Sequence, residues 1–433
     1  MSTTTLLLVG SAVFFTILAG IGFVTSRWIG HTEDFLVAGR QINWYVVGLA
    51  IAAMAWSSGF FALFSKFAIH FGFFAALSSM IATAIGYYVY GVYFTPFART
   101  LGSQSIGEFF EMRYDVKTRT VVSLYLGLAM MIFLPATSLG VAFILKGYAG
   151  LPIIQSATGM ILIIFVICIA GGLWGAAITD LVQAVIGYGT LAVVFGLMVT
   201  QVGGYEWLVN NVPEASTAFA FPGRFGFGLG ADSYVTWILL WGAMVLFGSP
   251  YYWLLANAPR SDADAKNGFR LASAMVFFLA FFVSLLPLYA YGAVPEQFQL
   301  MGGQVPAEGA VGVVAHMIPS GVGALLMVTV IASNVSSQTT TSLGGIAAWS
   351  RDVYQRLFRP DADPHEMLVP TRIITVVFFV VGWALVFVGD IQALLGVVLT
   401  ILGISALILL AGALSKSITP TSASSDRLRW TSL

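Results

Sequence analysis

Eleven stretches of mostly apolar residues follow one another along this chain, and few charges interrupt them. A helix of roughly 20 apolar residues spans the hydrocarbon core of a bilayer. Only 9% of the residues are charged, whereas soluble domains carry about a quarter. The sequence therefore predicts an all-α integral membrane protein with about 11 transmembrane helices. The candidate spans are 4–25, 43–65, 73–95, 120–147, 152–171, 174–201, 233–257, 270–295, 321–349, 371–389 and 391–415.

The positive charges orient these spans. An odd number of spans puts the two termini on opposite sides, and Lys and Arg favour the cytoplasmic loops. With the N-terminus outside, only Lys66, Lys146 and Arg224 of the 19 Lys and Arg residues face outside. We therefore expect a multi-pass protein of the plasma (inner) membrane, with its N-terminus outside and its C-terminus cytoplasmic. The first apolar segment lacks a positive n-region, so we interpret it as a retained helix and not a signal peptide.

Two spans are interrupted at matching places in two halves of the chain. Without the first span, ten spans remain, five in each half. Ser57-Ser58-Gly59 interrupts the leading span of one half, and Gly248-Ser249-Pro250 interrupts that of the other. Such a pair indicates a solute site near the bilayer midplane, between inverted repeats. Pro250 also lacks an N–H and frees a carbonyl about one turn earlier. For either break alone, a kink repaired by neighbouring helices is the alternative.

This pattern predicts one leading helix followed by a 5+5 inverted-repeat bundle with two broken helices. The expected boundaries are 1–42 for the leading helix and inside loop, 43–201 for the first five-helix repeat, 202–232 for an outside loop, 233–415 for the second repeat and 416–433 for a cytoplasmic tail.

A dense band of hydroxyl side chains, "IASNVSSQTTTSLGG", occupies residues 331–345. In a helix, Ser333, Ser336 and Ser337 fall on one narrow stripe. Neutral hydroxyl and carbonyl oxygens suit a weakly held, exchangeable cation. The stripe therefore predicts half of a cation site, and carbonyls freed at the Ser57 break could complete it. The alternative is that these small hydroxyl residues only hold membrane helices together.

Five segments, in this order, resemble the sodium:solute symporter family. They are "EDFLVAGRQINWYVVGLAIAA" (33–53), "SIGEFFEMRYD" (105–115), "GGLWGAAITDLVQ" (171–183), "NAPRSDADAKNGF" (257–269) and "SNVSSQTTTSLGGIAAWSRDVY" (333–354). The resemblance implies a leucine-transporter-type inverted-repeat bundle, with Na⁺ as the coupling ion. In one respect the chain differs from the family's proline-transporting branch, because Ala55 stands where some members carry an Asp. Many members also have two further helices, so the chain is either a short form or a truncation.

The resemblance also implies a set of site residues. The Na⁺ ligands would be the carbonyls of Ala53 and Trp56 and the hydroxyls of Ser333, Ser336 and Ser337. Asp180 matches the family's acidic residue at the head of the fifth core helix, and it is the only carboxylate inside a predicted span. An acid in the membrane is functional by default, and we expect Asp180 to relay Na⁺ toward the inside. The alternative is a buried partner for Gln183 or for an inside-loop arginine.

The residues around the two breaks are small, aromatic and uncharged, and they are the predicted solute contacts. These residues are Ser57, Ser58, Gly59, Phe60, Gly248, Ser249, Tyr251 and Tyr252. No Lys or Arg lies at membrane depth, although helix ends at the breaks can hold a carboxylate. The expected partner is therefore a small neutral, zwitterionic or monocarboxylate solute.

The sequence thus predicts a secondary active transporter that couples inward Na⁺ movement to solute uptake by alternating access. H⁺ coupling on the same fold, or a non-transporting solute sensor, are the alternatives. An enzyme is not expected, because the sequence shows no His, Cys and carboxylate cluster with metal spacing. The formal net charge is zero, so nothing points to a nucleic-acid partner.

Overall fold

The computed structural model describes residues 3–26, 41–103, 105–170, 173–228, 230, 232–239, 245–363 and 366–414. Within these ranges the regular secondary structure is helical, and the only other pairings are isolated β-bridges. Seven helices are long and apolar enough to cross a membrane, and one bent pair of shorter helices makes an eighth. The exact number of eleven spans stays a prediction. The predicted inside loop after the first span and the predicted tail lie outside the described residues.

Each predicted span overlaps a helix or an interrupted series of helices. The leading span and the first half correspond to α1 (Thr3–Ser26), α3 (Trp44–Ala55), α4 (Ser58–Phe71), α5 (Phe73–Val89), α8 (Val116–Ala149), α9 (Ile153–Ala170) and α10 (Leu173–Gln201). The second half corresponds to α13 (Tyr234–Thr236), α14 (Val245–Gly248), α15 (Pro250–Asn257), α16 (Asp262–Ala293), α18 (Ser320–Ala347), α20 (Leu368–Ala384) and α21 (Ile391–Leu414).

Shorter elements occupy the connections and the helix ends. They are η2 (Tyr90–Phe94), α6 (Thr95–Leu101), α7 (Ile106–Arg113), α11 (Tyr205–Asn211), α12 (Ala215–Ala218), η4 (Pro295–Gln297), η5 (Gln299–Met301), η6 (Ala307–Gly309), α17 (Ala310–Met317), η7 (Ala348–Gln355), α19 (Arg356–Phe358) and η8 (Leu385–Val388).

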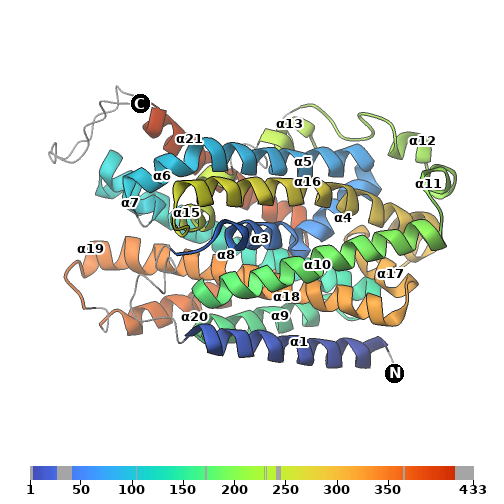
Figure 1. Cartoon of the computed structure of the whole chain (residues 1–433), viewed down its shortest axis with the longest axis horizontal. Helices are drawn as coiled ribbons and strands as arrows, with labels where there is room; N and C mark the ends of the chain where they lie inside the picture. The colour runs from blue at the N-terminus through green and yellow to red at the C-terminus, as the bar shows by residue number, and fades with distance from the viewer. Residues whose placement is uncertain are drawn as a thin grey trace.

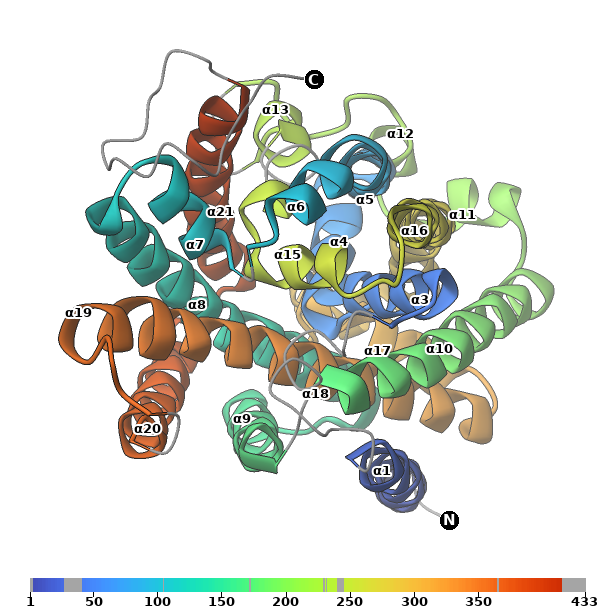
Figure 2. The same ribbon diagram turned by 60° about the vertical axis from the view of Figure 1, so that its left-hand side comes forward.

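The long helices lie side by side, and the short ones gather at the two ends of the bundle. In Figure 1, α6, α7 and α19 lie at one end, and α11 and α12 lie at the other. Figure 2 shows α4 and α15 near the centre, with α1, α9 and α20 along one edge. The two interrupted helices are therefore interior elements, surrounded by uninterrupted ones.

Two glycines bring the broken helix α4 into close contact with α8. A Cβ added at Gly140 would lie 2.6 Å from the Cα of Gly59. A Cβ added at Gly59 would lie 2.7 Å from the Cγ2 of Thr137. Small residues allow membrane helices to approach this closely, since van der Waals packing drives their association. The α4–α8 contact therefore fixes the position of the first break against the longest helix.

Charged residues form ion networks at both ends of the bundle. At the end that carries α7 and α19, Arg119 contacts Glu111 at 2.5 Å and Asp352 at 2.7 Å. At the opposite end, Lys66 lies 3.4 Å from Glu308 and 3.6 Å from Asp390. The first network joins α7 and α8 to η7, and the second joins α4 to η6 and to the start of α21.

The helix α7 begins at a side-chain N-cap, Ser105. The hydroxyl of Ser105 accepts a hydrogen bond from the backbone N–H of Glu108, at 3.1 Å. The side chain of Glu108 pairs with Arg351 at 3.2 Å. This connection attaches the short helix α7 to the end of the α18 segment.

Candidate ion and solute sites

The first break takes backbone carbonyls out of the helical hydrogen-bond ladder. α3 and α4 meet at an angle of 50°. The N–H of Ser57 donates to the carbonyl of Met54, at 3.1 Å, and so bypasses Ala53. The N–H of Phe60 donates to the carbonyl of Ser57, also at 3.1 Å, and so bypasses Trp56. A freed carbonyl in a membrane interior needs another partner, such as a side chain, water or ion. The two bypassed residues are those that the family resemblance implied.

The serine stripe of α18 faces this break. Ser333 is fully buried, and its hydroxyl donates to the freed carbonyl of Ala53 at 2.9 Å. One turn further along, the hydroxyl of Ser336 donates to Oδ1 of Asp180. The hydroxyl of Ser337 is buried and has no hydrogen-bond partner. The structure thus brings α3, α10 and α18 together around a set of oxygen atoms.

Asp180 is 3% exposed, and its described hydrogen bond comes from the α18 hydroxyl. Among the described residues, no Lys or Arg forms an ion pair with it, and its pairing with an inside-loop arginine stays a prediction. Gln183, one turn further along α10, is fully buried, and neither of its amide atoms has a partner. Beyond it, the indole of Trp56 packs against α10 at Gly187. The side of α10 that carries Asp180 therefore presents one carboxylate and, one turn later, the amide of Gln183.

The second break is repaired locally. Pro250 opens α15 and has no N–H for the carbonyl of Leu246. That carbonyl instead accepts from the N–H of Ser249, at 3.4 Å. The N–H of Trp253 then donates to the carbonyl of Ser249, at 3.3 Å. The carbonyl that Pro250 was expected to free is therefore already bound within the chain.

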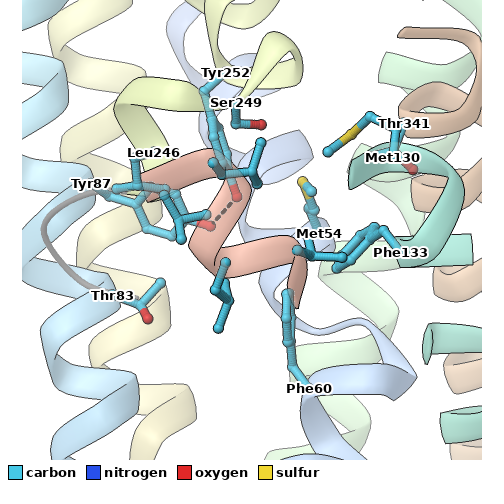
Figure 3. A pocket seen from close by; sticks show the side chains of 14 residues that line it. Met54, Phe60, Thr83, Tyr87, Met130, Phe133, Leu246, Ser249, Tyr252 and Thr341 are labelled. Carbon is cyan, nitrogen blue, oxygen red and sulfur yellow. Dashed lines mark hydrogen bonds between the residues drawn. The ribbon is translucent and has the colours of Figure 1, made fainter. Parts of the chain in front are cut away.

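A cavity lies between the two breaks. Figure 3 shows it from close by. It contains no charged side chain. The cavity is lined by Met54, Phe60, Thr83, Tyr87, Met130, Phe133, Val245, Leu246, Ser249, Tyr252, Thr341, Val398, Leu399 and Leu402.

Three of the predicted solute contacts line this cavity: Phe60, Ser249 and Tyr252. Two others, Ser57 and Tyr251, do not line it, although their hydroxyls are buried without a hydrogen-bond partner. Their role as solute contacts stays a prediction.

The remaining three predicted contacts lie in helix–helix interfaces. The hydroxyl of Ser58 donates to the carbonyl of Thr137 at 3.1 Å. Gly59 packs against the same residue of α8, and Gly248 packs against the carbonyl of Leu402 in α21. These small residues let the broken helices approach their neighbours. The local sequence could not distinguish a packing role of this kind from solute binding.

Other residues that line the cavity were not indicated by the local sequence pattern. Thr83 and Tyr87 come from α5, which has no break, and Met130 and Phe133 come from α8. Thr341 belongs to the hydroxyl band, and this was the only feature of the sequence that indicated a functional role for it. The phenol oxygen of Tyr87 lies 2.6 Å from that of Tyr252, so α5 and α15 are hydrogen-bonded together at the cavity.

An all-helical membrane bundle with two interrupted interior helices and a cavity between them defines the class of secondary transporters. Residues 35–414 match the model of the sodium:solute symporter family. The chain belongs to this family, so it is a Na⁺-coupled transporter of a small organic solute and not an enzyme.

Several curated proteins are similar over most of the chain. A "Sodium/glucose cotransporter" of Vibrio parahaemolyticus is 26% identical, over 86% of this chain and 73% of its own length. The "Sodium/sialic acid symporter NanT" of Aliivibrio fischeri is 24% identical, over 84% and 73%. "Sodium/glucose cotransporter 4" of Danio rerio is 20% identical, over 88% of this chain and 62% of its own length. The chain therefore spans about three-quarters of the bacterial relatives and less of the vertebrate one.

Solved structures show the same fold. The substrate-bound outward-open state of a Na⁺-coupled sialic acid symporter superimposes with a TM-score of 0.75 at 17% identity, covering 94% of this chain and 86% of that one. Mhp1, a nucleobase-cation-symport-1 family transporter, superimposes with a TM-score of 0.52 at 13% identity, covering 88% and 80%. These likenesses confirm the predicted all-helical transporter fold, whereas the domain boundaries stay a prediction.

Proposed function

We propose that the oxygens at the first break and on the α18 stripe bind the coupling Na⁺. The ligands are the carbonyls of Ala53 and Trp56 and the hydroxyls of Ser333, Ser336 and Ser337. The observation that supports this most is the 2.9 Å contact between the Ser333 hydroxyl and the Ala53 carbonyl. The break frees this carbonyl, and the two oxygens lie close enough to share one cation.

Asp180 is the proposed exit point for Na⁺. Its carboxylate contacts the Ser336 hydroxyl, so an ion that leaves the serine stripe next meets the carboxylate of Asp180. From the first break to Asp180, the residues run along α18 toward the end that carries α7 and α19. That end is the cytoplasmic end in the proposed orientation, with the N-terminus outside and the chain in the inner membrane.

Uptake into proteoliposomes tests the Na⁺ assignment. We expect solute accumulation to require an inward Na⁺ gradient, and we expect Ser336→Ala with Ser337→Ala to abolish that requirement or the uptake itself. Ser284→Ala is the matched control, because this buried serine of α16 bonds only to its own helix, at 2.6 Å from the carbonyl of Ala280. Uptake that keeps its full Na⁺ dependence in the double variant would refute the assignment.

The proposed solute is small and neutral, zwitterionic or a monocarboxylate. The relatives are named for glucose and sialic acid, but the cavity of this chain has no charged side chain and few hydroxyls. A thermal-stabilisation screen of a solute library, in Na⁺ and in K⁺, would identify the ligand. We expect hits that stabilise the protein only in Na⁺.

A further inference from the structure

The solute cavity has two unlike walls. Thr83, Tyr87, Ser249 and Tyr252 contribute hydroxyls from α5 and from the second broken helix. Figure 3 shows Thr83 and the two tyrosines on one side of the cavity, with Met54, Met130 and Phe133 across from them. We call the opposite side the apolar wall. It contains Met54, Met130 and Phe133, and Val398, Leu399 and Leu402 of α21 also line the cavity.

Two of the five hydroxyl side chains that line the cavity donate their protons within their own helices. The hydroxyl of Thr83 donates to the carbonyl of Ser79 at 3.2 Å. The hydroxyl of Thr341 donates to the carbonyl of Ser337 at 2.9 Å. Neither threonine therefore has a donor to offer a solute, so few donors remain for it.

The phenol pair is different. The oxygens of Tyr87 and Tyr252 are 2.6 Å apart, and a single proton lies between them. Each phenol carries one O–H, so the phenol that accepts in this bond keeps its own proton. That proton is directed away from the pair, and both side chains line the cavity. A hydrogen bond from one phenol polarises the other, which strengthens its next bond.

More donors lie beside this pair, in the first turn of α15. Ser249 is the N-cap residue, and its side chain makes no capping hydrogen bond. The first N–H of α15 that bonds to a carbonyl four residues earlier is that of Trp253, which donates to the carbonyl of Ser249. The N–H groups of Tyr251 and Tyr252 come before it, in the first turn, and the first N–H groups of a helix have no acceptor within the helix. Donors at a helix N-terminus favour a negatively charged group.

We propose that the solute is a monocarboxylate with an apolar body. Its carboxylate is bound by the Tyr87–Tyr252 pair and the start of α15, and its body lies against the apolar wall. Met54 directly follows Ala53, a proposed Na⁺ ligand. The bound cation therefore lies next to the cavity and offsets the negative charge, which makes carboxylate binding depend on Na⁺.

The same features disfavour a polyhydroxylated sugar. A sugar carries several hydroxyls around its ring, and each one needs a partner when it is buried. The methionine, phenylalanine, valine and leucine side chains that line the cavity provide none. A carboxylate concentrates its polar atoms at one end, where this cavity has its donors.

The proposal rests on the proposed symport function, so its test separates the two. The purified full chain is heated in NaCl or KCl with potassium salts of straight-chain carboxylates from propanoate to octanoate, with potassium benzoate, with pentanamide and with glucose. We expect at least one carboxylate to stabilise the protein in NaCl only. We expect pentanamide and glucose to have no effect. Stabilisation by NaCl alone reports on the Na⁺ site independently of any solute.

Variants then test the phenol pair. We expect Tyr252→Phe and Tyr87→Phe to weaken binding of the best carboxylate by about tenfold, while stabilisation by NaCl alone is kept. Tyr90→Phe is the matched control, because the hydroxyl of Tyr90 is buried without a partner and does not line the cavity. We expect that variant to bind the carboxylate as the parent protein does.

Two results would overturn the proposal. One is glucose, but none of the carboxylates, stabilising the protein in NaCl. The other is full carboxylate affinity in both tyrosine variants. If NaCl alone gives no stabilisation, the Na⁺ site fails instead, and carboxylate binding in KCl then decides the solute class by itself.

Discussion

Single oxygen atoms at the first break acquire their role from their neighbours. The carbonyl of Ala53 is an ordinary backbone group until Ser57 bonds elsewhere and leaves it for Ser333. Asp180 is likewise placed by one hydroxyl, that of Ser336. An isolated charge in the membrane is costly, and partners or an ion offset that cost. At the scale of the residue, the site is therefore a chain of short polar contacts between three helices.

Replacing Asp180 with asparagine tests that chain. Asn keeps an oxygen that can accept from Ser336, so we expect Asp180→Asn to fold and reach the membrane. It removes the negative charge next to the stripe, and we expect the Na⁺ concentration for half-maximal uptake to rise by about fivefold or more, roughly 1 kcal/mol. The Na⁺ dependence of initial uptake rates measures this. An unchanged half-maximal concentration would contradict the assigned role.

At the scale of the element, the breaks and the glycine contacts decide how the helices fit. α4 can approach α8 because Gly59 and Gly140 have no side chains at the crossing. α15 starts where Pro250 ends the ladder of the preceding helix. The missing N–H of Pro250 thus positions one broken helix, and the small volume of Gly59 and Gly140 positions the other.

Adding one methyl group at the crossing tests the packing. The new Cβ of Gly140→Ala would meet the backbone of α4, which cannot give way as a flexible side chain would. We expect a loss of about 1–3 kcal/mol, seen as a lower thermal unfolding midpoint in detergent. Gly159→Ala in α9 is the control, since its new Cβ meets nothing within 4 Å. Equal midpoints for the two variants would show that α4 and α8 do not pack as described.

Restoring the missing donor tests the second break. Pro250→Ala supplies an N–H that can bond to the carbonyl of Leu246, which now accepts from Ser249. We expect the break to straighten, so that uptake falls at least tenfold while the unfolding midpoint stays equal or rises. Pro287→Ala is the control, because Pro287 lies inside the uninterrupted α16. Normal uptake by Pro250→Ala would mean that the break is dispensable.

At the scale of the whole molecule, the two ion networks lie at opposite ends of the cavity-bearing bundle. Arg119 connects α7 and η7 through Glu111 and Asp352, and Lys66 connects α4 to the start of α21. Alternating access requires contacts at one end to break while those at the other end form. The networks are therefore expected to bias the balance between the inward-facing and outward-facing states.

Acid tests the network around Glu111. The hydrogen bond from Arg356 holds the pKa of Glu111 below its ordinary value of 4.5. A lowered pKa means that the contribution to stability is present above the ordinary value and is lost as pH falls through the lowered one. We expect the unfolding midpoint to be level from pH 7 to about 5 and to fall below about 4.5. In Glu111→Gln we expect a smaller acid-induced fall; a fall as large as in the parent would contradict this.

Much of this arrangement was predictable from local chemistry. The two breaks follow from Gly, Ser and Pro within apolar runs, and the structure places them at Trp56–Ser57 and at Ser249. The serine stripe follows from helical periodicity. Thr83 and Tyr87 were not predictable as cavity residues, because α5 is uninterrupted and its face toward the cavity depends on where α15 lies.

The sequence by itself determined that the chain lies in a membrane, which helices break and which hydroxyls share a face. These properties depend on hydropathy, backbone chemistry and helical period, and each acts within a single segment of roughly 20 residues or fewer. Only the tertiary structure decided that Ser333 meets Ala53, that Asp180 meets Ser336 and that Tyr87 meets Tyr252. These partners are 280, 156 and 165 residues apart. No local rule links them, since their contact depends on how whole helices pack.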